Sequence, residues 1–201
     1  MRRFLHIGPS KVGKDHAGLG FQSDDWQEVR LDLDPAARPD ILANMTDMKT
    51  VASGSFDAIF SSHTIEHLYP DDVRKAFQEC YRVLAPWGFM VMVCPDLQAV
   101  AEPIARGELL TVLYESNEGP VTPLDMLYGY RGYFTLPDRR EVMTHHTGFT
   151  LPVMVSSLES IGFPTVVGRR RLSCYELWTF ASKTLLSEEE IREQVGIHFS
   201  L

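Results

Sequence analysis

The chain has 201 residues, of which 44% are hydrophobic and 23% charged, and its formal net charge is -8 at pH 7. This length suits a single domain with one sizeable core, and the composition is typical of an ordinary globular protein and excludes a disordered one. The negative charge repels phosphate backbones and argues against nucleic acid as a partner, because the basic residues cluster in sequence only at Arg169, Arg170 and Arg171.

The spacing of the cysteines and the N-terminal residues indicate the cellular compartment of the protein. Three cysteines are an odd number at wide spacing, which is typical of buried thiols in a reducing environment and not of a disulfide framework or a zinc site. Gly8 and Pro9 interrupt the first apolar run too early for the core of a signal peptide, and no apolar stretch is long enough to span a bilayer. We therefore expect a cytoplasmic protein with no membrane partner.

The first third of the chain reads as short strands separated by loops. Residues 4–7 are apolar and run into Gly8, and the glycine-rich stretch up to residue 20 has no helical period. Residues 29–33 alternate apolar and polar side chains, a very short strand is expected around 40–43, and 55–61 form a better strand candidate.

The middle of the chain contains the clearest helix and the clearest strand. Apolar residues recur at helical spacing over 70–84, with a proline and two aspartates at the start, which predicts an α-helix. Residues 89–94 are a continuous apolar run, typical of a strand buried on both faces of a parallel sheet. A further helix is predicted over 97–106.

Residues 107–148 show no regular pattern and hold several glycines and prolines, among them Pro137. A structureless stretch of that length is unusual inside a compact domain, so we interpret it as short helices and loops that form a lid or substrate pocket. Its aromatic side chains suit a ring-bearing or sugar acceptor, or alternatively form a small core of their own. These side chains are Tyr114, Tyr128, Tyr130, Tyr133 and Phe134.

The last part of the chain predicts a helix, a hairpin and a second helix. Thr150 is positioned to cap a helix that ends near residue 160, and strands at 164–167 and 175–181, separated by a turn containing the arginines, form a hairpin at the sheet edge. Ser187 and Glu190 form a capping-box pattern. The whole order predicts a single α/β domain, residues 1–201, with a Rossmann-like, doubly wound, mostly parallel sheet and an antiparallel edge strand.

Residues 55–97 carry a more specific pattern. Their sequence is SFDAIFSSHTIEHLYPDDVRKAFQECYRVLAPWGFMVMVCPDL, in which an S-F-D strand is followed by an E-H pair, a helix that ends R-V-L-x-P-x-G, and a strand that ends P-D. This order resembles the class I S-adenosylmethionine-dependent methyltransferases that act mostly on small molecules. The resemblance implies S-adenosylmethionine as cofactor and methyl transfer to a small molecule or saccharide.

Ligands of open α/β sheets bind beyond the carboxyl ends of the strands, which places a set of polar and small residues at one site. By the resemblance, Asp32 binds the ribose hydroxyls, with Asp34 as the alternative, and Asn44 with Met45 reads the adenine. Without that role, Asp32 caps a turn and Asn44 ends a strand. The cofactor-binding candidates are His6, Gly8, Ser10, Asp32, Asn44, Met45, Ser61 and Ser62.

The first loop departs from the family pattern. The family has an acidic residue followed by three spaced glycines, whereas this chain has His6-Ile-Gly8-Pro-Ser10-Lys-Val12. Two explanations stay open. Either the glycine-rich segment up to Gly20 folds into a different cofactor loop, or cofactor binding is lost and the fold serves as a non-catalytic binding or assembly module.

Four residues near the strand ends or in the lid are candidates for a general base, should the acceptor lose a proton. They are His63, Asp96, His145 and His146, and each has a structural alternative such as helix capping or bracing of a turn. The H-x-x-E-H motif from His63 to His67 also matches a zinc peptidase pattern. Because the methyltransferase pattern expects E-H at this point, we predict no metal. Nothing in the sequence indicates the acceptor atom or the oligomeric state.

Overall fold

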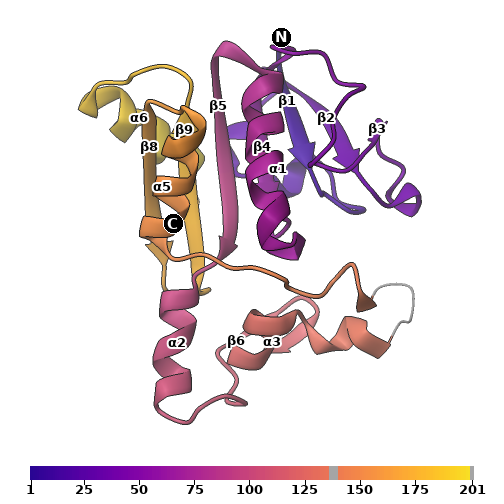
Figure 1. Ribbon diagram of the computed structural model, residues 1–201, viewed down its shortest axis with the longest axis vertical. Helices are drawn as coiled ribbons and strands as arrows, with labels where there is room; N and C mark the ends of the chain where they lie inside the picture. The colour runs from indigo at the N-terminus through magenta and orange to yellow at the C-terminus, as the bar shows by residue number, and fades with distance from the viewer. Residues whose placement is uncertain (136–139, 200–201) are drawn as a thin grey trace.

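The computed structural model describes residues 1–135 and 140–199, which form one seven-stranded sheet with helices on its faces and a small hairpin outside it (Figure 1). The sheet strands are β1 (Arg2–Ile7), β2 (Trp26–Asp32), β3 (Ile41–Leu42), β4 (Phe56–Ser62), β5 (Leu84–Pro95), β8 (Thr165–Arg171) and β9 (Glu176–Ser182). The hairpin pairs β6 (Tyr114–Ser116) with β7 (Gly119–Val121). The α-helices are α1 (Pro70–Val83), α2 (Leu97–Ala105), α3 (Pro123–Tyr128), α5 (Leu151–Ile161) and α6 (Glu188–His198).

The strand order is β3-β2-β1-β4-β5-β9-β8, which confirms the predicted doubly wound α/β fold. The pairs from β3 through β5 are parallel, whereas β9 pairs antiparallel with both β5 and β8. The antiparallel strand of the edge hairpin is therefore β9, which lies one position in from the edge. Since the chain moves outward from β1 in one direction and then from β4 in the other, the topological switch point lies between β1 and β4.

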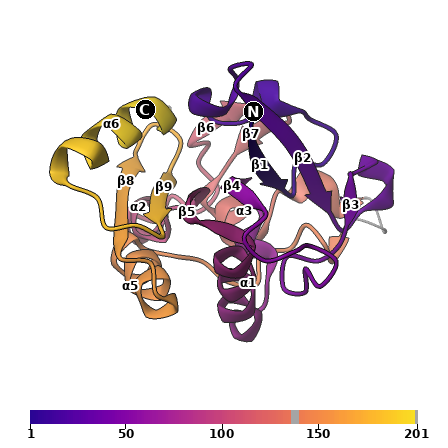
Figure 2. The ribbon, with the colours of Figure 1, turned by 90° about the horizontal axis from the view of Figure 1, so that it is seen from above.

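One face of the sheet is covered by α1 and α5, as the view from above shows (Figure 2). Helix α1 begins with Pro70 at its first turn, where a missing amide hydrogen costs nothing, and two aspartates complement its dipole. Its apolar stripe, including Phe77 and Cys80, is buried against the sheet together with Met154 and Leu158 of α5. The helices predicted at 70–84, 97–106 and 150–160 are thus confirmed as α1, α2 and α5.

The other face is covered by α6 and by two single 3-10 turns, η1 (Lys14–His16) and η2 (Leu19–Phe21), in place of a long helix after β1 (Figure 2). The stretch up to residue 20 is irregular, as predicted. Phe21, at the end of η2, is fully buried against Phe4 and Phe60 of the sheet. The predicted capping box is confirmed at the start of α6, where Ser187 and Glu190 bond reciprocally.

His198, near the end of α6, is a buried histidine in this aromatic layer. Its ring lies with its centroid 4.8 Å from those of both Phe21 and Phe89, it is 3% exposed, and its Nδ1 has no hydrogen-bond partner among the described residues. Burial, helped slightly by the positive charge of Arg2, lowers the pKa of His198 from 6.5 to about 4. Between about pH 6.5 and pH 4, His198 is therefore mostly neutral in the folded protein and mostly protonated in the unfolded chain.

We expect this histidine to make the fold acid-sensitive. The unfolded state binds the proton first as pH falls, so the free energy of unfolding should drop between pH 6.5 and 4, by about 3 kcal/mol for this group alone. Urea unfolding at pH 7 and pH 4 measures this drop in the parent and in His198→Phe. The drop in His198→Phe should be smaller than that of the parent by about 3 kcal/mol. The exposed His16 is the matched control, and an equal acid loss in His198→Phe and His16→Phe would contradict the assignment.

Residues 107–135 and 140–148 lie beyond the carboxyl ends of the strands, next to α2 (Figure 1). They contain α3 and 3-10 turns, as predicted, and in addition the β6–β7 hairpin, which the sequence did not indicate. Arg131 binds Asp125, whose carboxylate also closes the capping box of α3. Pro137 lies outside the described residues, as does the side chain of Phe134.

Of the aromatic side chains predicted to line the segment, two serve a small core and one does not. Tyr114 and Tyr130 pack against a buried cluster formed by Val100, Val121 and Met126. Tyr128 is 57% exposed. Tyr114 and Tyr130 therefore form part of a small core, which is the alternative considered from the sequence, whereas Tyr133 lines the cavity described in the next section.

Two local predictions require correction. The arginines 169–171 do not form a turn but lie in β8, because carboxylates beside them neutralise Arg170 and Arg171 in an extended strand. Thr150 stands at the start of α5, yet its side chain makes no capping bond. Within residues 1–135 and 140–199, no helix is both long and apolar enough to cross a membrane.

Candidate functional site

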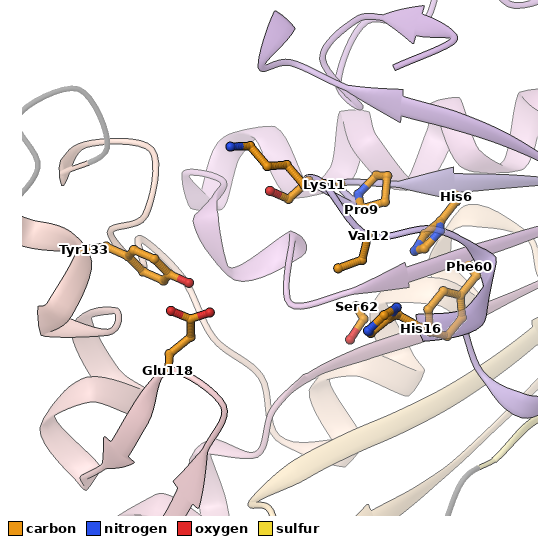
Figure 3. A pocket seen from close by; sticks show the side chains of 11 residues that line it. His6, Pro9, Lys11, Val12, His16, Phe60, Ser62, Glu118 and Tyr133 are labelled. Carbon is orange, nitrogen blue, oxygen red and sulfur yellow. The ribbon is translucent and has the colours of Figure 1, made fainter. Parts of the chain in front are cut away.

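A cavity of about 480 Å³ opens at the switch point, beyond the carboxyl ends of β1 and β4 (Figure 3). It is lined by His6, Gly8, Pro9, Ser10, Lys11, Val12, His16, Phe60, Ser62, Glu118 and Tyr133. Four of the predicted cofactor residues are among them, from β1, its loop and the end of β4. Glu118 and Tyr133 come from the 107–148 segment and face the loop across the cavity (Figure 3).

The loop after β1 is held in a left-handed conformation. Gly8 has φ 68° and its N–H donates to the carbonyl of Leu31, while Ser10 has φ 52° and its N–H donates to Oδ2 of Asp32 at 2.9 Å. The other oxygen of Asp32 accepts the N–H of Asp34 at 2.9 Å. Asp32 is 9% exposed and thus anchors the cavity loop to the end of β2, which is the turn-capping role considered from the sequence.

A histidine–glutamate pair lies beside this loop. His6, 3% exposed, has its Nδ1 2.6 Å from Oε1 of Glu28 in β2, and Oε2 of Glu28 accepts the N–H of Lys14. Burial lowers the pKa of His6, and Glu28 opposes that effect. A carboxylate on the neighbouring strand therefore holds both His6 and the loop that follows, although Glu28 itself does not line the cavity. Glu28 was not among the predicted site residues, because nothing in the sequence of one strand indicates which side chain of the neighbouring strand it contacts.

The remaining cofactor candidates do not line the cavity. Asn44 is exposed, and its Oδ1 accepts the N–H and the hydroxyl of Thr46, so its side chain closes a turn. Met45 is buried in the core under α1. Ser61 is 1% exposed and its Oγ has no hydrogen-bond partner among the described residues.

His63 follows β4 in a left-handed conformation, with φ 50°. Its Nδ1 lies 3.2 Å from Oε1 of Glu66, and its Nε2 lies 3.2 Å from Oε1 of Glu176. Desolvation lowers its pKa, but hydrogen bonds to Glu176 and Glu66 outweigh that effect and raise the pKa to about 10. His63 is therefore a cation held between two carboxylates and has no free nitrogen to accept a proton at neutral pH. The contact with Glu176 was not predictable from a local pattern, because Glu176 is 113 residues away in sequence.

Asp96 has two structural partners. It is fully buried, its Oδ1 accepts the N–H of Gln98 at the start of α2, and its Oδ2 accepts a hydrogen bond from Nε of Arg170. The capping alternative considered from the sequence is thus what the structure contains, with an ion pair added.

The two remaining base candidates, His145 and His146, also have structural contacts. Nδ1 of His145 lies 2.9 Å from the carbonyl of Met126, and the ring of His146 stacks on Tyr69 with centroids 4.1 Å apart. The backbone N–H groups of His146 and Thr147 both donate to the carbonyl of Glu66. Hence none of the four base candidates lines the cavity.

The H-x-x-E-H motif does not form a zinc peptidase helix. Residues Ile65–His67 form a 3-10 turn of three residues, η4, so His63 and His67 do not lie on one face of an α-helix. Nδ1 of His67 contacts the carbonyl of Thr144 instead of sharing a ligand with His63. The structure therefore gives no support to the peptidase alternative.

An open, doubly wound sheet with a cavity at its switch point defines a protein of the Rossmann-like α/β class. Residues 20–92 match the family model described as a methyltransferase domain. No curated protein matches the chain. Together with the fold, the match of residues 20–92 supports the resemblance to class I S-adenosylmethionine-dependent methyltransferases that residues 55–97 carry.

Solved structures share this fold at low sequence identity. A SAM-dependent methyltransferase from Archaeoglobus fulgidus aligns with a TM-score of 0.57 and 13% identity, over 90% of this chain and 86% of that one. The 1,6-didemethyltoxoflavin-N1-methyltransferase of Burkholderia thailandensis, with bound S-adenosylhomocysteine, aligns with a TM-score of 0.54 and 15% identity, over 92% and 72%. The CMeT domain of the citrinin polyketide synthase gives 0.54 and 14%, over 92% of this chain but only 47% of that one.

Proposed function

We propose that the protein binds S-adenosylmethionine at the switch-point cavity and transfers its methyl group to a small molecule or saccharide. The observation that carries this proposal is that the cavity is open and lined by the β1 loop and the end of β4. A degenerate module would have the crevice filled by Trp26, Lys11 or lid aromatics. Trp26 is instead buried in the second core layer, and Lys11 extends from the loop at the cavity wall (Figure 3).

The cavity lining suits a zwitterionic cofactor. Lys11 offers a positive charge to the carboxylate of the cofactor's amino-acid part, and the backbone of Gly8 and Ser10 approaches without large side chains. Asp32 lies directly behind Ser10, so its remaining lone pairs are available to ribose hydroxyls. We assign the cofactor's ribose to Asp32 on this ground.

Methyl transfer from a sulfonium is an in-line displacement with an activated leaving group, so the protein chiefly positions the acceptor and excludes water. We propose residues 107–148 as a lid that does this, with Glu118 and Tyr133 facing the acceptor (Figure 3). Among the described residues that line the cavity, Glu118 is the one carboxylate, and we propose it in place of the four sequence candidates as general base, where the acceptor loses a proton. The reduced Cys80 and Cys94 suit the cytoplasmic location proposed from the sequence.

Isothermal titration with S-adenosylmethionine and S-adenosylhomocysteine tests the proposal. We expect micromolar binding of both, followed by a screen of acceptors. Absence of binding to either would instead favour a non-catalytic module built on the same fold.

The ribose assignment predicts that Asp32→Ala weakens cofactor binding by about 1.5–3 kcal/mol, the range for a hydrogen bond to a charged group. Because Asp32 also holds the loop, the decisive measurement compares S-adenosylhomocysteine with its 2′,3′-dideoxy analogue. The parent should discriminate between the two by titration, whereas Asp32→Ala should not. Undiminished discrimination in the variant would rule out the ribose contact and leave Asp32 with its loop role.

A further inference from the structure

A second group of polar side chains lies outside the switch-point cavity, where η4 meets the lid. One carboxylate oxygen of Glu66 and one ring nitrogen each of His67 and His145 lie within 4.8 Å of one another. Glu66 is fully buried, and its Oε2 has no hydrogen-bond partner among the described residues. Burying a carboxylate oxygen without a partner costs free energy, so a ligand that binds this oxygen would remove that cost.

Both imidazole rings are already oriented by the backbone. Nδ1 of His67 lies 3.2 Å from the carbonyl of Thr144, and Nδ1 of His145 lies 2.9 Å from the carbonyl of Met126. A carbonyl only accepts, so each Nδ1 carries the hydrogen and each Nε2 keeps its lone pair. Histidines that bind metal ions typically donate their second ring nitrogen in this way.

We propose that Glu66, His67 and His145 form a site for a divalent transition-metal ion, with Zn²⁺ as the expected occupant. Two imidazoles and one carboxylate are a ligand set that Zn²⁺ accepts, with a fourth position left for water. Ligand atoms about 2.1 Å from a tetrahedral ion are about 3.4 Å apart, so small side-chain rotations close the present separation. This proposal departs from the sequence expectation of no metal, and it does not depend on the proposed methyl transfer.

The surrounding contacts make the site preorganised. The N–H groups of His146 and Thr147 donate to the carbonyl of Glu66 at 2.9 and 3.2 Å, so the two segments that supply the ligands are already joined. His63 holds the other oxygen of Glu66, Oε1, and thereby fixes the carboxylate plane. Since His145 belongs to the lid and Glu66 to the turn after β4, the ion would fasten the lid to the sheet.

The test uses the full chain without a histidine tag, stripped with a chelator and titrated with ZnCl₂. We expect one equivalent of Zn²⁺ to bind with a submicromolar Kd and to raise Tm. Replacing Zn²⁺ by Co²⁺ should give visible absorption bands of a four-coordinate nitrogen and oxygen site. A chain that takes up no zinc, or whose Co²⁺ spectrum is that of the aqueous ion, overturns the proposal.

Variants assign the ligands. His145→Ala and Glu66→Gln should each weaken Zn²⁺ binding at least about 100-fold, whereas His146→Ala, the neighbouring histidine stacked on Tyr69, should bind as the parent does. Where His145→Ala fails to fold, His145→Gln keeps most of the volume and serves in its place. Parent-like affinity in the folded Glu66 and His145 variants would place the ion elsewhere and overturn the assignment.

Discussion

Gly8→Ala is expected to lower the free energy of unfolding by about 3 kcal/mol, because two separate effects add at this position. The backbone has φ 68°, where any side chain strains the left-handed conformation. In addition, a Cβ on Gly8 would lie 2.4 Å from Oγ1 and 2.7 Å from Cγ2 of Thr64, which is held by hydrogen bonds to the carbonyls of Ser62 and Ile7. Urea unfolding monitored by circular dichroism measures the change.

A matched control and a partner substitution separate the two effects. Gly13→Ala lies in the same loop with negative φ and a nearest neighbour at 3.3 Å on an exposed side chain, so it should cost well under 1 kcal/mol. The double variant Gly8→Ala with Thr64→Ala should recover the crowding share and keep only the strain of about 1 kcal/mol. Additive losses in the double variant would mean that Thr64 does not crowd Gly8.

The glycine requirement illustrates what the sequence could and could not provide. Gly8 was predicted as a cofactor-binding candidate, and Gly8 does line the cavity. The side chain nearest to its missing Cβ, however, is Thr64, which is 56 residues further along the chain. A sequence shows that a position needs glycine, but which neighbour imposes the need depends on packing between β1 and the turn after β4.

Most of the fold was predictable because its signals are local. The period of α1, the apolar run of β5 and the capping box of α6 each arise within one segment, and all three are where they were predicted. The β6–β7 hairpin was not, since its strands have three residues each and include Gly119 and Pro120 in place of an apolar alternation. The arginines of β8 were assigned to a turn because Asp96, the buried carboxylate that pairs with Arg170, is 74 residues away in sequence.

From the sequence, only the part of the site at the carboxyl ends of the strands could be predicted. His6, Gly8, Ser10 and Ser62 line the cavity because the carboxyl ends of neighbouring parallel strands meet there, which is a rule of the fold. Glu28 and Glu176 were missed, since their roles depend on which side chains face each other across strands. Glu118 and Tyr133 reach the cavity through tertiary packing of residues 107–135, which no local pattern encodes.

Asp96→Ala is expected to lower the free energy of unfolding by about 4 kcal/mol. The change removes the acceptor that caps α2, worth about 1 kcal/mol, and leaves Arg170 without its buried partner, which typically costs about 3 kcal/mol or more. The side chain of Arg170 is 27% exposed, and its second carboxylate neighbour, Glu102, is 3.9 Å away and largely exposed, so neither water nor Glu102 replaces Asp96 fully.

Asp96→Asn provides the control that separates a structural role from catalysis. Its amide oxygen can still accept from either Gln98 or Arg170, so we expect a loss of about 1–2 kcal/mol, while Asp96→Asn combined with Arg170→Met should lose less than the sum of the two single changes. Thermal and urea unfolding of the parent, Asp96→Asn, Arg170→Met and the double variant give the coupling free energy between Asp96 and Arg170. Since Asp96 is fully buried and absent from the cavity wall, cofactor affinity in folded Asp96→Asn should match the parent. Unchanged stability with abolished methyl transfer in this variant would instead make Asp96 the base, and the ion pair with Arg170 would then have to open during the reaction.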